Sequence, residues 1–336
     1  MAARSCPGVP AFLITIDTEG DDLWSGRPEI TTRNATFLPR FQALCEDHGF
    51  RPTYLTNYEM ATDPHFAALG RSVIGRGMGE IGMHLHAWHS PPHFPLTGCD
   101  TRHMPYLIEY PEEVMRAKIV HLTRLLEDTF GTRMQSHRAG RWAFDGRYAT
   151  ILNELGYAAD CSVTPHVDWR GTKGRPDGAG GTDYRSFLSG PYVLALDDIS
   201  APGRSGLLEV PMTTIDTAPR ALRDLEAATG STPALGRLRR RVWPVEWLRP
   251  NGRNRTRMRR IIDLCVAEKR EYVEFMLHSS ELMPGGSPTF PTEESIEILY
   301  RDMADLFAYA SAHFQGETLA GFAQGWSAKE RRLQAG

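Results

Sequence analysis

The sequence predicts an α/β protein built on a mostly parallel sheet or barrel. Apolar segments of strand length alternate along the chain with longer segments whose apolar residues recur at helical spacing. Such alternation favours parallel strands joined by helices. Acidic residues and histidines also follow directly after several of the apolar segments. In folds of this class chemistry gathers at the carboxyl ends of the strands, so these polar residues are the first candidates for a functional site.

The first half of the chain supplies most of the expected strands. Residues 11–16 are a continuous apolar run, which suits a strand buried on both faces. The expected order continues with a helix at 34–48, a strand at 52–56, a helix at 63–75 and a strand at 80–86. A long amphipathic helix at 110–130, a short strand at 134–137, a helix at 145–155 and a strand at 157–161 follow.

The second half is less regular. Residues 170–190 are rich in glycine and polar residues and are expected to form a surface loop. The expected elements after it are a strand pair at 192–196 and 207–210, a helix at 259–269, a strand at 272–277, a helix at 293–313 and a short strand at 318–322.

An arginine-rich insertion is expected at residues 212–258, within a single domain that spans residues 1–336. Its basic residues include the run Arg239, Arg240 and Arg241. One interpretation is a solvated helical insertion. The other is a lid or patch that meets a phosphate group or another acidic surface.

The composition narrows the class of protein. The chain has 336 residues, of which 41% are hydrophobic and 24% charged, as is typical of a globular protein. A net charge of −3 gives no field that favours nucleic acid or a membrane. The five cysteines are scattered without a Cys-x-x-Cys pair, so neither a disulfide framework nor a thiolate zinc site is indicated. Neither an export signal nor a run of membrane-spanning length is recognised, so the cytoplasm is the expected compartment.

The histidine-rich stretch at 80–89 is the strongest local signal. His84 and His86 are two residues apart on the predicted strand, so their side chains share a face at its end, and His89 follows in the loop. Imidazole is a common zinc ligand, which makes half of a metal site one interpretation. A polar loop with incidental histidines is the other.

An acidic cluster follows the first predicted strand. Asp17, Glu19, Asp21 and Asp22 fall within six residues. A solvated turn would tolerate this crowding of like charges. Acids at the end of a buried strand are also what a cation site requires.

Polar residues therefore end four separate segments: Asp17 with Glu19, His84 with His86 and His89, His137 with Arg138 and Arg141, and His278. Together they form the inventory of a metal hydrolase. Two histidines and one carboxylate leave the fourth zinc position open to water, whose pKa the metal lowers. A second carboxylate can take the water's proton, a separate histidine can protonate the leaving group, and an arginine can keep the base ionised.

The pattern resembles the polysaccharide deacetylases, the NodB-homology or carbohydrate esterase family 4 group, over roughly residues 10–165 and 270–325. Residues 15–20, Thr-Ile-Asp-Thr-Glu-Gly, resemble the first family motif, usually Thr-Phe-Asp-Asp-Gly. In that motif the first aspartate is the general base and the second binds metal. The resemblance implies Asp17 as the base and, since position 18 is threonine, Glu19 as the metal-binding acid.

The segment 80–84 resembles the lead into the second motif, with His84 as a metal ligand. The family's second histidine stands four residues later, where this chain has Trp88, so His86 or His89 must replace it. The phrase His-Leu-His-Ala-Trp resembles a divergent branch linked to surface-polysaccharide gene clusters, which favours His86.

Residues 137–142 resemble the third motif, whose arginine supports the base, and so imply that role for Arg138. Residues 277–279 resemble the last motif, whose histidine is the general acid, and so imply that role for His278. Residues 160–162 resemble a segment that forms the wall of the site.

The resemblance implies a distorted (β/α) barrel and a metal-dependent hydrolase of a non-peptide C–N bond. The expected substrate is an N-acetylated sugar, as a nucleotide-linked or lipid-linked precursor, and the expected cofactor is a divalent metal, with zinc first. Two alternatives stay open: a metal-dependent amidohydrolase acting on a small amide, and a catalytically degenerate domain that binds glycan. Neither nucleic acid nor a transmembrane segment is expected, and the oligomeric state is left open.

Overall fold

The computed structural model describes residues 9–21, 23, 29–219, 221–223, 225, 239 and 241–335. Its main-sheet strands are β1 (Ala11–Thr18), β2 (Thr53–Thr56), β3 (Glu80–Leu85), β4 (Ser136–Ala139), β5 (Ala159–Asp160), β6 (Tyr192–Val193), β7 (Leu208–Glu209), β10 (Tyr272–His278) and β11 (Gln315–Glu317). The sheet follows the order β10-β1-β2-β3-β4-β5-β7-β6, and β11 pairs with the start of β1. All of these pairs are parallel except the antiparallel pair β6–β7.

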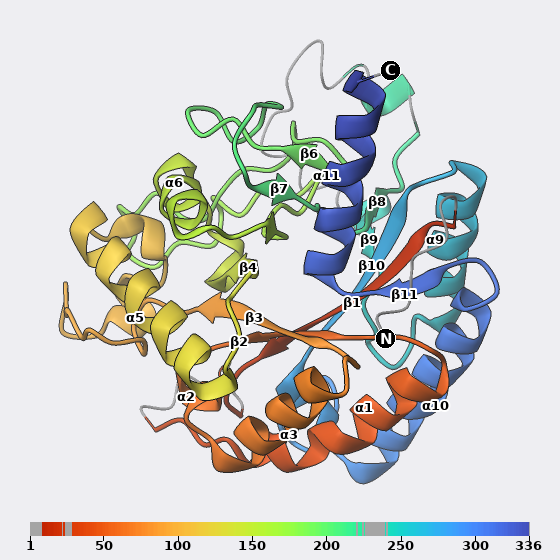
Figure 1. Cartoon of the computed structure of the whole chain (residues 1–336), viewed down its shortest axis with the longest axis horizontal. Helices are drawn as coiled ribbons and strands as arrows, with labels where there is room; N and C mark the ends of the chain where they lie inside the picture. Colours follow the sequence, from red (N-terminus) through yellow and green to blue (C-terminus); the bar gives the residue numbers. More distant parts are fainter. Residues whose placement is uncertain are drawn as a thin grey trace.

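Helices pack outside the curled sheet (Figure 1). They are α1 (Leu38–Asp47), α2 (Tyr58–Ala61), α3 (Pro64–Gly75), α4 (Asp100–His103), α5 (Glu112–Phe130), α6 (Gly146–Leu155), α9 (Arg255–Ala267), α10 (Glu293–Ala310) and α11 (Leu319–Ala335). In Figure 1, α1, α3 and α10 lie together along one side of the sheet, and α5 with α6 continue this outer layer. The result is the mixed α/β half-barrel that the alternation of the sequence predicts.

Strand β1 shows how the chain builds two cores. Phe12, Ile14 and Ile16 belong to the large core between the strands and the outer helices. Ala11 and Leu13 point to the opposite, inner face, because successive side chains alternate along a strand. Further along that inner face come Thr15 and Asp17, both buried. The interior of the half-barrel is therefore apolar at the amino end of β1 and polar at its carboxyl end.

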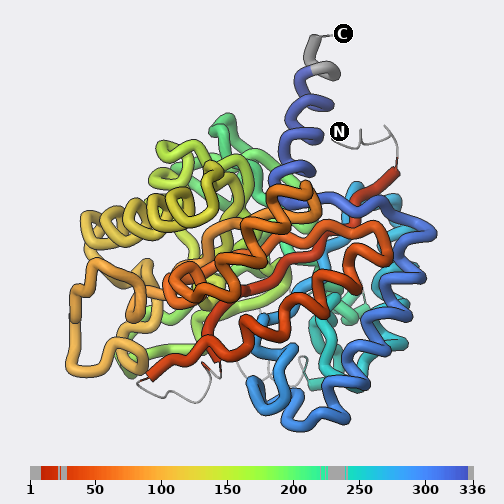
Figure 2. The backbone as a smooth tube through the Cα atoms, turned by 60° about the horizontal axis from the view of Figure 1, so that its bottom comes forward, coloured from red at the N-terminus to blue at the C-terminus, as the bar shows by residue number. Residues whose placement is uncertain are grey.

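Helix α11 closes the apolar end of the interior. Its residues Leu319 and Ala323 pack in the inner core with residues of β1, β2, β5, β7 and β10. The rest of the helix projects from the molecule in Figure 2. Here one prediction was wrong: residues 318–322 were expected as a strand, but they begin α11, and the strand is β11. Leu319, Phe322 and Ala323 are spaced three and four apart, which is the helical period.

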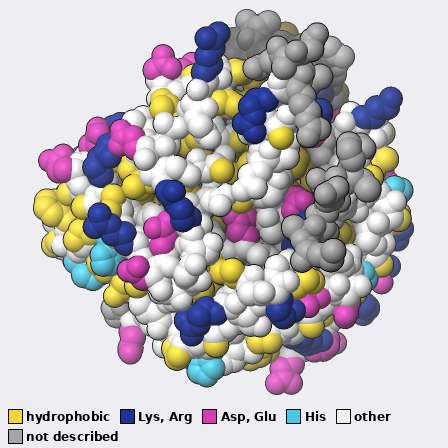
Figure 3. Space-filling view, viewed as in Figure 1, with side chains coloured by type: hydrophobic (Ala, Val, Ile, Leu, Met, Phe, Trp, Pro, Cys, Tyr) yellow, Lys and Arg dark blue, Asp and Glu magenta, His cyan; other side chains and the backbone are white. Residues whose placement is uncertain are grey.

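The described part of the predicted insertion contains a separate antiparallel hairpin, β8 (Thr214–Asp216) and β9 (Val245–Trp247). Arg240 lies outside the described residues, and the limits 212–258 stay a prediction. In Figure 3 basic and acidic side chains are interspersed over the face shown. Among the described residues, none of the helices combines the length and apolarity that a membrane span requires.

Candidate metal centre

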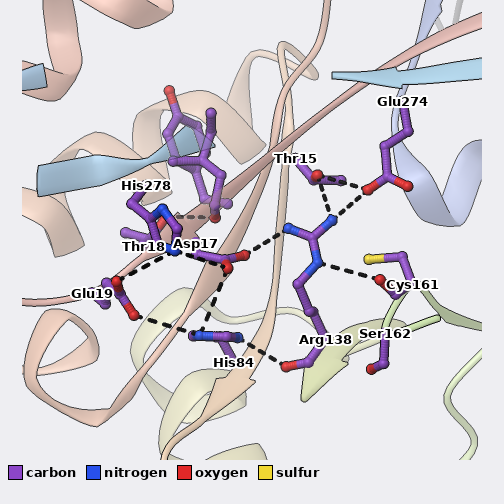
Figure 4. Close-up of polar contacts among 12 residues, drawn as sticks. Thr15, Asp17, Thr18, Glu19, His84, Arg138, Cys161, Ser162, Glu274 and His278 are labelled. Atoms are coloured by element: carbon purple, nitrogen blue, oxygen red, sulfur yellow. Dashed lines mark hydrogen bonds and ion pairs between the residues drawn. The ribbon is translucent and has the colours of Figure 1, made fainter. Parts of the chain in front are cut away.

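The carboxyl ends of β1, β3, β4 and β10 bring the predicted residues together (Figure 4). Asp17 of β1 stands beside His278 of β10 in the parallel register. His84 of β3 stands in the same way beside Arg138 of β4. Strand β2 separates the two pairs in the sheet, and the curl of the sheet turns both toward the interior.

Three side chains form a compact group of potential metal ligands: Glu19, His84 and His86. A Glu19 carboxylate oxygen, Oε2, lies 3.0 Å from His86 Nε2 and 3.5 Å from His84 Nε2. The two imidazole Nε2 atoms are 3.1 Å apart. All three residues are buried, the most exposed being His86 at 8%. Three lone pairs from three residues therefore converge on one point.

The spacing of these atoms fits a bound metal ion. In a tetrahedral site with bonds of about 2.0–2.1 Å, neighbouring ligand atoms lie roughly 3.3 Å apart. The three distances of the group, 3.0, 3.1 and 3.5 Å, scatter around that value. His84 is also oriented as metal ligands usually are, because its Nδ1 lies 2.9 Å from the carbonyl oxygen of Arg138. Donation of the Nδ1 proton to that oxygen leaves Nε2 as the free donor atom.

Hydrogen bonds fix Glu19 in the loop after β1. Its N–H donates to Ser279 Oγ at 3.0 Å, and Asn34 Nδ2 donates to its carbonyl oxygen at 2.7 Å. The loop is thereby tied to the end of β10. Asp21 faces away from the group, since its carboxylate accepts from the Asn34 N–H and from the Arg33 side chain. The acidic cluster therefore divides, with Asp17 and Glu19 turned inward, while Asp22 lies outside the described residues.

Asp17 lies between the ligand group and a buried arginine. Arg138 Nη1 donates to Asp17 Oδ1 at 2.6 Å. The other carboxylate oxygen is 3.6 Å from His278 Nε2 and 3.9 Å from His84 Nε2. Burial alone would raise the pKa of Asp17, but Arg138 and the two histidines outweigh it, so the pKa is lowered. Asp17 is thus held as a carboxylate beside the group.

Arg138 has a second carboxylate partner that the sequence did not reveal. Its Nη2 bonds to Glu274 on β10 and donates to Thr15 Oγ1 at 2.7 Å. Burial raises the pKa of Glu274 to about 7 against the opposing effect of Arg138. The sequence did contain one signal for Glu274. This residue is the only acid within the apolar strand, and it lies four residues before His278, so the two side chains point to the same face of the sheet. Arg138 is fully buried, so these contacts replace its hydration.

His278 is held from behind by Arg249 and Glu281, and the sequence did not reveal the role of Arg249. Arg249 Nη2 lies 2.8 Å from His278 Nδ1 and 3.0 Å from Glu281 Oε1. Burial opposes the ionisation of Glu281, but Arg249 and His278 lower its pKa to about 2. Nδ1 thus faces both a guanidinium, which can only donate, and the Glu281 carboxylate oxygen Oε2 at 3.4 Å, which can only accept, so the other ring nitrogen, Nε2, is the one left to face the site. That nitrogen faces Asp17 and Glu19.

The remaining candidates lie outside the ligand group. His89 is not one of the three grouped residues, and burial together with His86 lowers its pKa to about 4. The Trp88 ring lies tilted against the His86 ring, with ring centroids 4.7 Å apart. His137 points away from the interior of the half-barrel. On that outer side its Nδ1 lies 2.5 Å from an Asp160 carboxylate oxygen. Arg141 lies over the Tyr106 ring, 5.2 Å from its centroid.

No protein-family model and no curated protein sequence matches the chain. Among solved structures, a candidate polysaccharide deacetylase from Mycobacterium smegmatis aligns with a TM-score of 0.51 at 16% identity, over 98% of this chain and 95% of that one. A candidate glycoside hydrolase/deacetylase from Parabacteroides distasonis gives 0.58 at 12% identity, over 96% and 73%. A carbohydrate esterase family 4 pseudoenzyme from Bacillus anthracis aligns at 0.39 with 9% identity, over 95% and 66%.

Sequence identities this low show a similar fold only. The activity has to be argued from the residues of the candidate site. The first two structures share the α/β barrel architecture over nearly the whole of this chain. The resemblance drawn from the motifs is thereby confirmed at the level of the fold. In its fold, the chain is a polysaccharide deacetylase-like protein.

Proposed function

We propose that the chain is a metal-dependent deacetylase that hydrolyses the N-acetyl group of a sugar or polysaccharide precursor. The observation that carries this proposal is the buried group Glu19, His84 and His86, with Asp17 and His278 both beside it. The group has the donor set of a catalytic zinc site, in which protein residues fill three positions and water the fourth.

Glu19, His84 and His86 would hold the metal, and their nitrogen and oxygen donors favour zinc. A bound divalent ion lowers the pKa of a water molecule and polarises the acetyl carbonyl. The protein's own contribution is to keep His84 in the tautomer that leaves Nε2 unprotonated, through its contact with the Arg138 carbonyl.

Asp17 acts as the general base in this proposal. Arg138 keeps Asp17 ionised, as the lowered pKa of Asp17 indicates. One carboxylate oxygen is bound to Arg138, and the other faces the space between His84 and His278. The free oxygen takes a proton from the attacking water, while Arg138 prevents the carboxylate from rotating away.

His278 acts as the general acid. Hydrolysis of the amide requires a proton on the departing nitrogen, and the Nε2 position faces the interior. Arg249 and Glu281 fix the ring from behind. The base and the acid therefore stand on neighbouring strands, with Asp17 Oδ2 3.6 Å from His278 Nε2.

A cluster of tryptophans favours a sugar over a small amide. Trp247 of β9 lies between Trp142 and Trp169, with ring centroids 5.7 and 6.2 Å away. Arg138 lies 4.8 Å from the centroid of Trp142, so the cluster adjoins the catalytic groups. Flat aromatic rings stack well against the C–H face of a pyranose, and Trp169 and Trp247 are only partly buried.

The test is acetate release together with metal content. Wild type, His84→Ala and Asp17→Asn are compared on N-acetylglucosamine oligomers, a nucleotide-linked N-acetyl sugar and simple N-alkylacetamides. We expect about one equivalent of metal in wild type and in Asp17→Asn, none in His84→Ala, and turnover of sugars by wild type alone.

His89→Ala is the matched control, because His89 lies close in sequence but outside the ligand group. It should keep both the metal and the activity. Turnover of the simple amides but not of the sugars would instead support an amidohydrolase. Metal-free wild type that binds glycan without releasing acetate would support a degenerate binding domain.

A further inference from the structure

A second cavity lies apart from the metal centre, between the β8–β9 hairpin and α9. Its volume is about 240 Å³. Three arginines line it: Arg223 from the segment after the β8 strand, Arg260 from α9, and Arg270 from the loop after that helix. None of the proposed catalytic residues or metal ligands lines it.

Three arginines and three acids line this cavity, but they are not all paired with one another. Glu268 pairs with Arg270 at 2.7 Å, whereas Asp216 pairs with Arg239 and Glu246 with Arg257 at 3.8 Å, two arginines outside the lining. Arg223 and Arg260 have no carboxylate within ion-pair distance in the described part of the chain. Two guanidiniums at the cavity are therefore without a carboxylate partner among the described residues. Arg239, which the sequence offered as a phosphate contact, is already neutralised by Asp216.

Helix α9 and the backbone at His166 form part of the cavity wall. Arg260, Leu264 and Glu268 are four residues apart and share one face of α9. His166, which also lines the cavity, has a left-handed backbone with a φ of 71°. Such a conformation in a residue other than glycine costs energy and is found most often at binding and active sites.

The imidazole of His166 responds to both the acid and the arginines near it. Burial lowers the pKa of this imidazole. Asp216 acts in the opposite direction, but Arg223 and Arg270 lower the pKa further. The side chains of these arginines therefore face the cavity closely enough to affect a group within it.

We propose that this cavity binds a phosphate monoester, with the Arg223 and Arg260 guanidiniums as its principal contacts. Two unmatched guanidiniums fit a dianion, and their fork of N–H donors suits phosphate oxygens. At about 240 Å³ the cavity is smaller than the roughly 300–1,000 Å³ of drug-sized sites, so it suits a phosphate on a small substituent. The proposal does not depend on deacetylase activity.

The test is a calorimetric titration with inorganic phosphate at constant ionic strength, with sodium chloride as the matched salt. We expect one saturable site in wild type and affinity at least about tenfold weaker in Arg260→Ala and in Arg223→Ala. Arg253→Ala is the control, because Arg253 is an exposed arginine that does not line the cavity. It should bind as wild type does.

The titration is repeated on His84→Ala, because a metal centre also attracts phosphate. If His84→Ala still binds phosphate as wild type does, the phosphate site is distinct from the metal centre. The result then holds whether or not the protein is a deacetylase. Equal affinity in Arg260→Ala and wild type, or binding that His84→Ala abolishes, overturns the proposal. If an alanine variant fails to fold, Arg260→Lys replaces it in the titration. This variant keeps the positive charge but loses the guanidinium fork, and we expect its affinity for phosphate to lie between those of wild type and a variant without the charge.

Discussion

Arg138 is the residue on which the interior of the protein depends most. It is fully buried and bonds to two carboxylates, Asp17 through Nη1 and Glu274 through Nη2. The arginine neutralises charges that would otherwise repel each other in a medium of low dielectric constant. A structural role and the proposed catalytic role are therefore joined in one side chain. Changing Asp17 and Glu274 individually separates the two roles.

We predict that Arg138→Met destabilises the fold by about 3–5 kcal/mol, because it leaves buried carboxylates without a counter-charge. Adding Glu274→Gln should restore part of that loss, since it removes one of the two orphaned charges. The free energy of unfolding in urea measures both effects. A double variant no more stable than Arg138→Met alone would show that Glu274 is not coupled to Arg138.

Glu281 gives the stability of the protein a pH dependence at low pH. Its pKa falls from 4.5 in the unfolded chain to about 2 in the fold, so the folded state binds fewer protons between those values. Stability from this group is fully present above pH 4.5 and is lost as the pH falls toward 2. The loss is roughly 3 kcal/mol for a shift of this size.

Glu281→Gln should therefore flatten the stability curve between pH 4.5 and 2 relative to wild type. Unfolding by urea at several pH values in that window gives the comparison. Parallel curves for the two proteins would mean that Glu281 is not held ionised by Arg249 and His278.

At the scale of elements, the chain just after β4 passes close to the end of β3. A Cβ on Gly140 would lie 2.4 Å from the Leu85 carbonyl oxygen and 2.8 Å from His86 Nδ1. Contacts this short cannot be accommodated without movement. Gly140 thus lets the chain after β4 pass directly beside a proposed metal ligand.

Gly140→Ala should displace His86 and weaken metal binding, with a loss of stability of about 1–3 kcal/mol from overpacking. Gly75→Ala is the matched control, because nothing lies within 4 Å of the added Cβ and the residue ends helix α3. It should be neutral or slightly stabilising. Unfolding curves and metal titration of both variants test this, and equal metal affinity in the two would contradict it.

The sequence predicts elements better than it predicts partners. Hydrophobic patterns and strand parity located the strands that carry Asp17, His84 and His278, because those signals are local. They did not reveal Arg249 or Glu274, whose roles depend on contacts between distant segments. The β8–β9 hairpin was missed because its surroundings are dominated by arginine, which carries no strand period.

At the scale of the molecule, the interior is layered along the axis of the half-barrel. An apolar layer with α11 occupies one end, the Thr15–Arg138–Glu274 layer follows, and the candidate metal centre lies at the other end. The apolar packing and the candidate metal centre thus lie at different ends of one interior. Changes in the apolar layer should therefore affect folding while leaving the ligands in place.

Leu319→Ala should lower the free energy of unfolding by about 2–5 kcal/mol, because the side chain is fully buried in the apolar layer. The folded fraction should still bind the same equivalents of metal as wild type. Elemental analysis of the folded protein and urea unfolding together measure the two effects. Loss of metal from folded Leu319→Ala would contradict the separation of the layers.

The pairing of β1 with β10 has a consequence for biosynthesis. Strand β1 emerges from the ribosome first, yet its partner β10 is translated only after most of the chain. The proposed metal ligands and Arg138 therefore exist in the nascent protein long before His278, the proposed general acid, does. During that interval β1 exposes an unpaired edge, which is a template for aggregation, and we expect this chain to fold slowly and to benefit from a chaperone until its last strands dock.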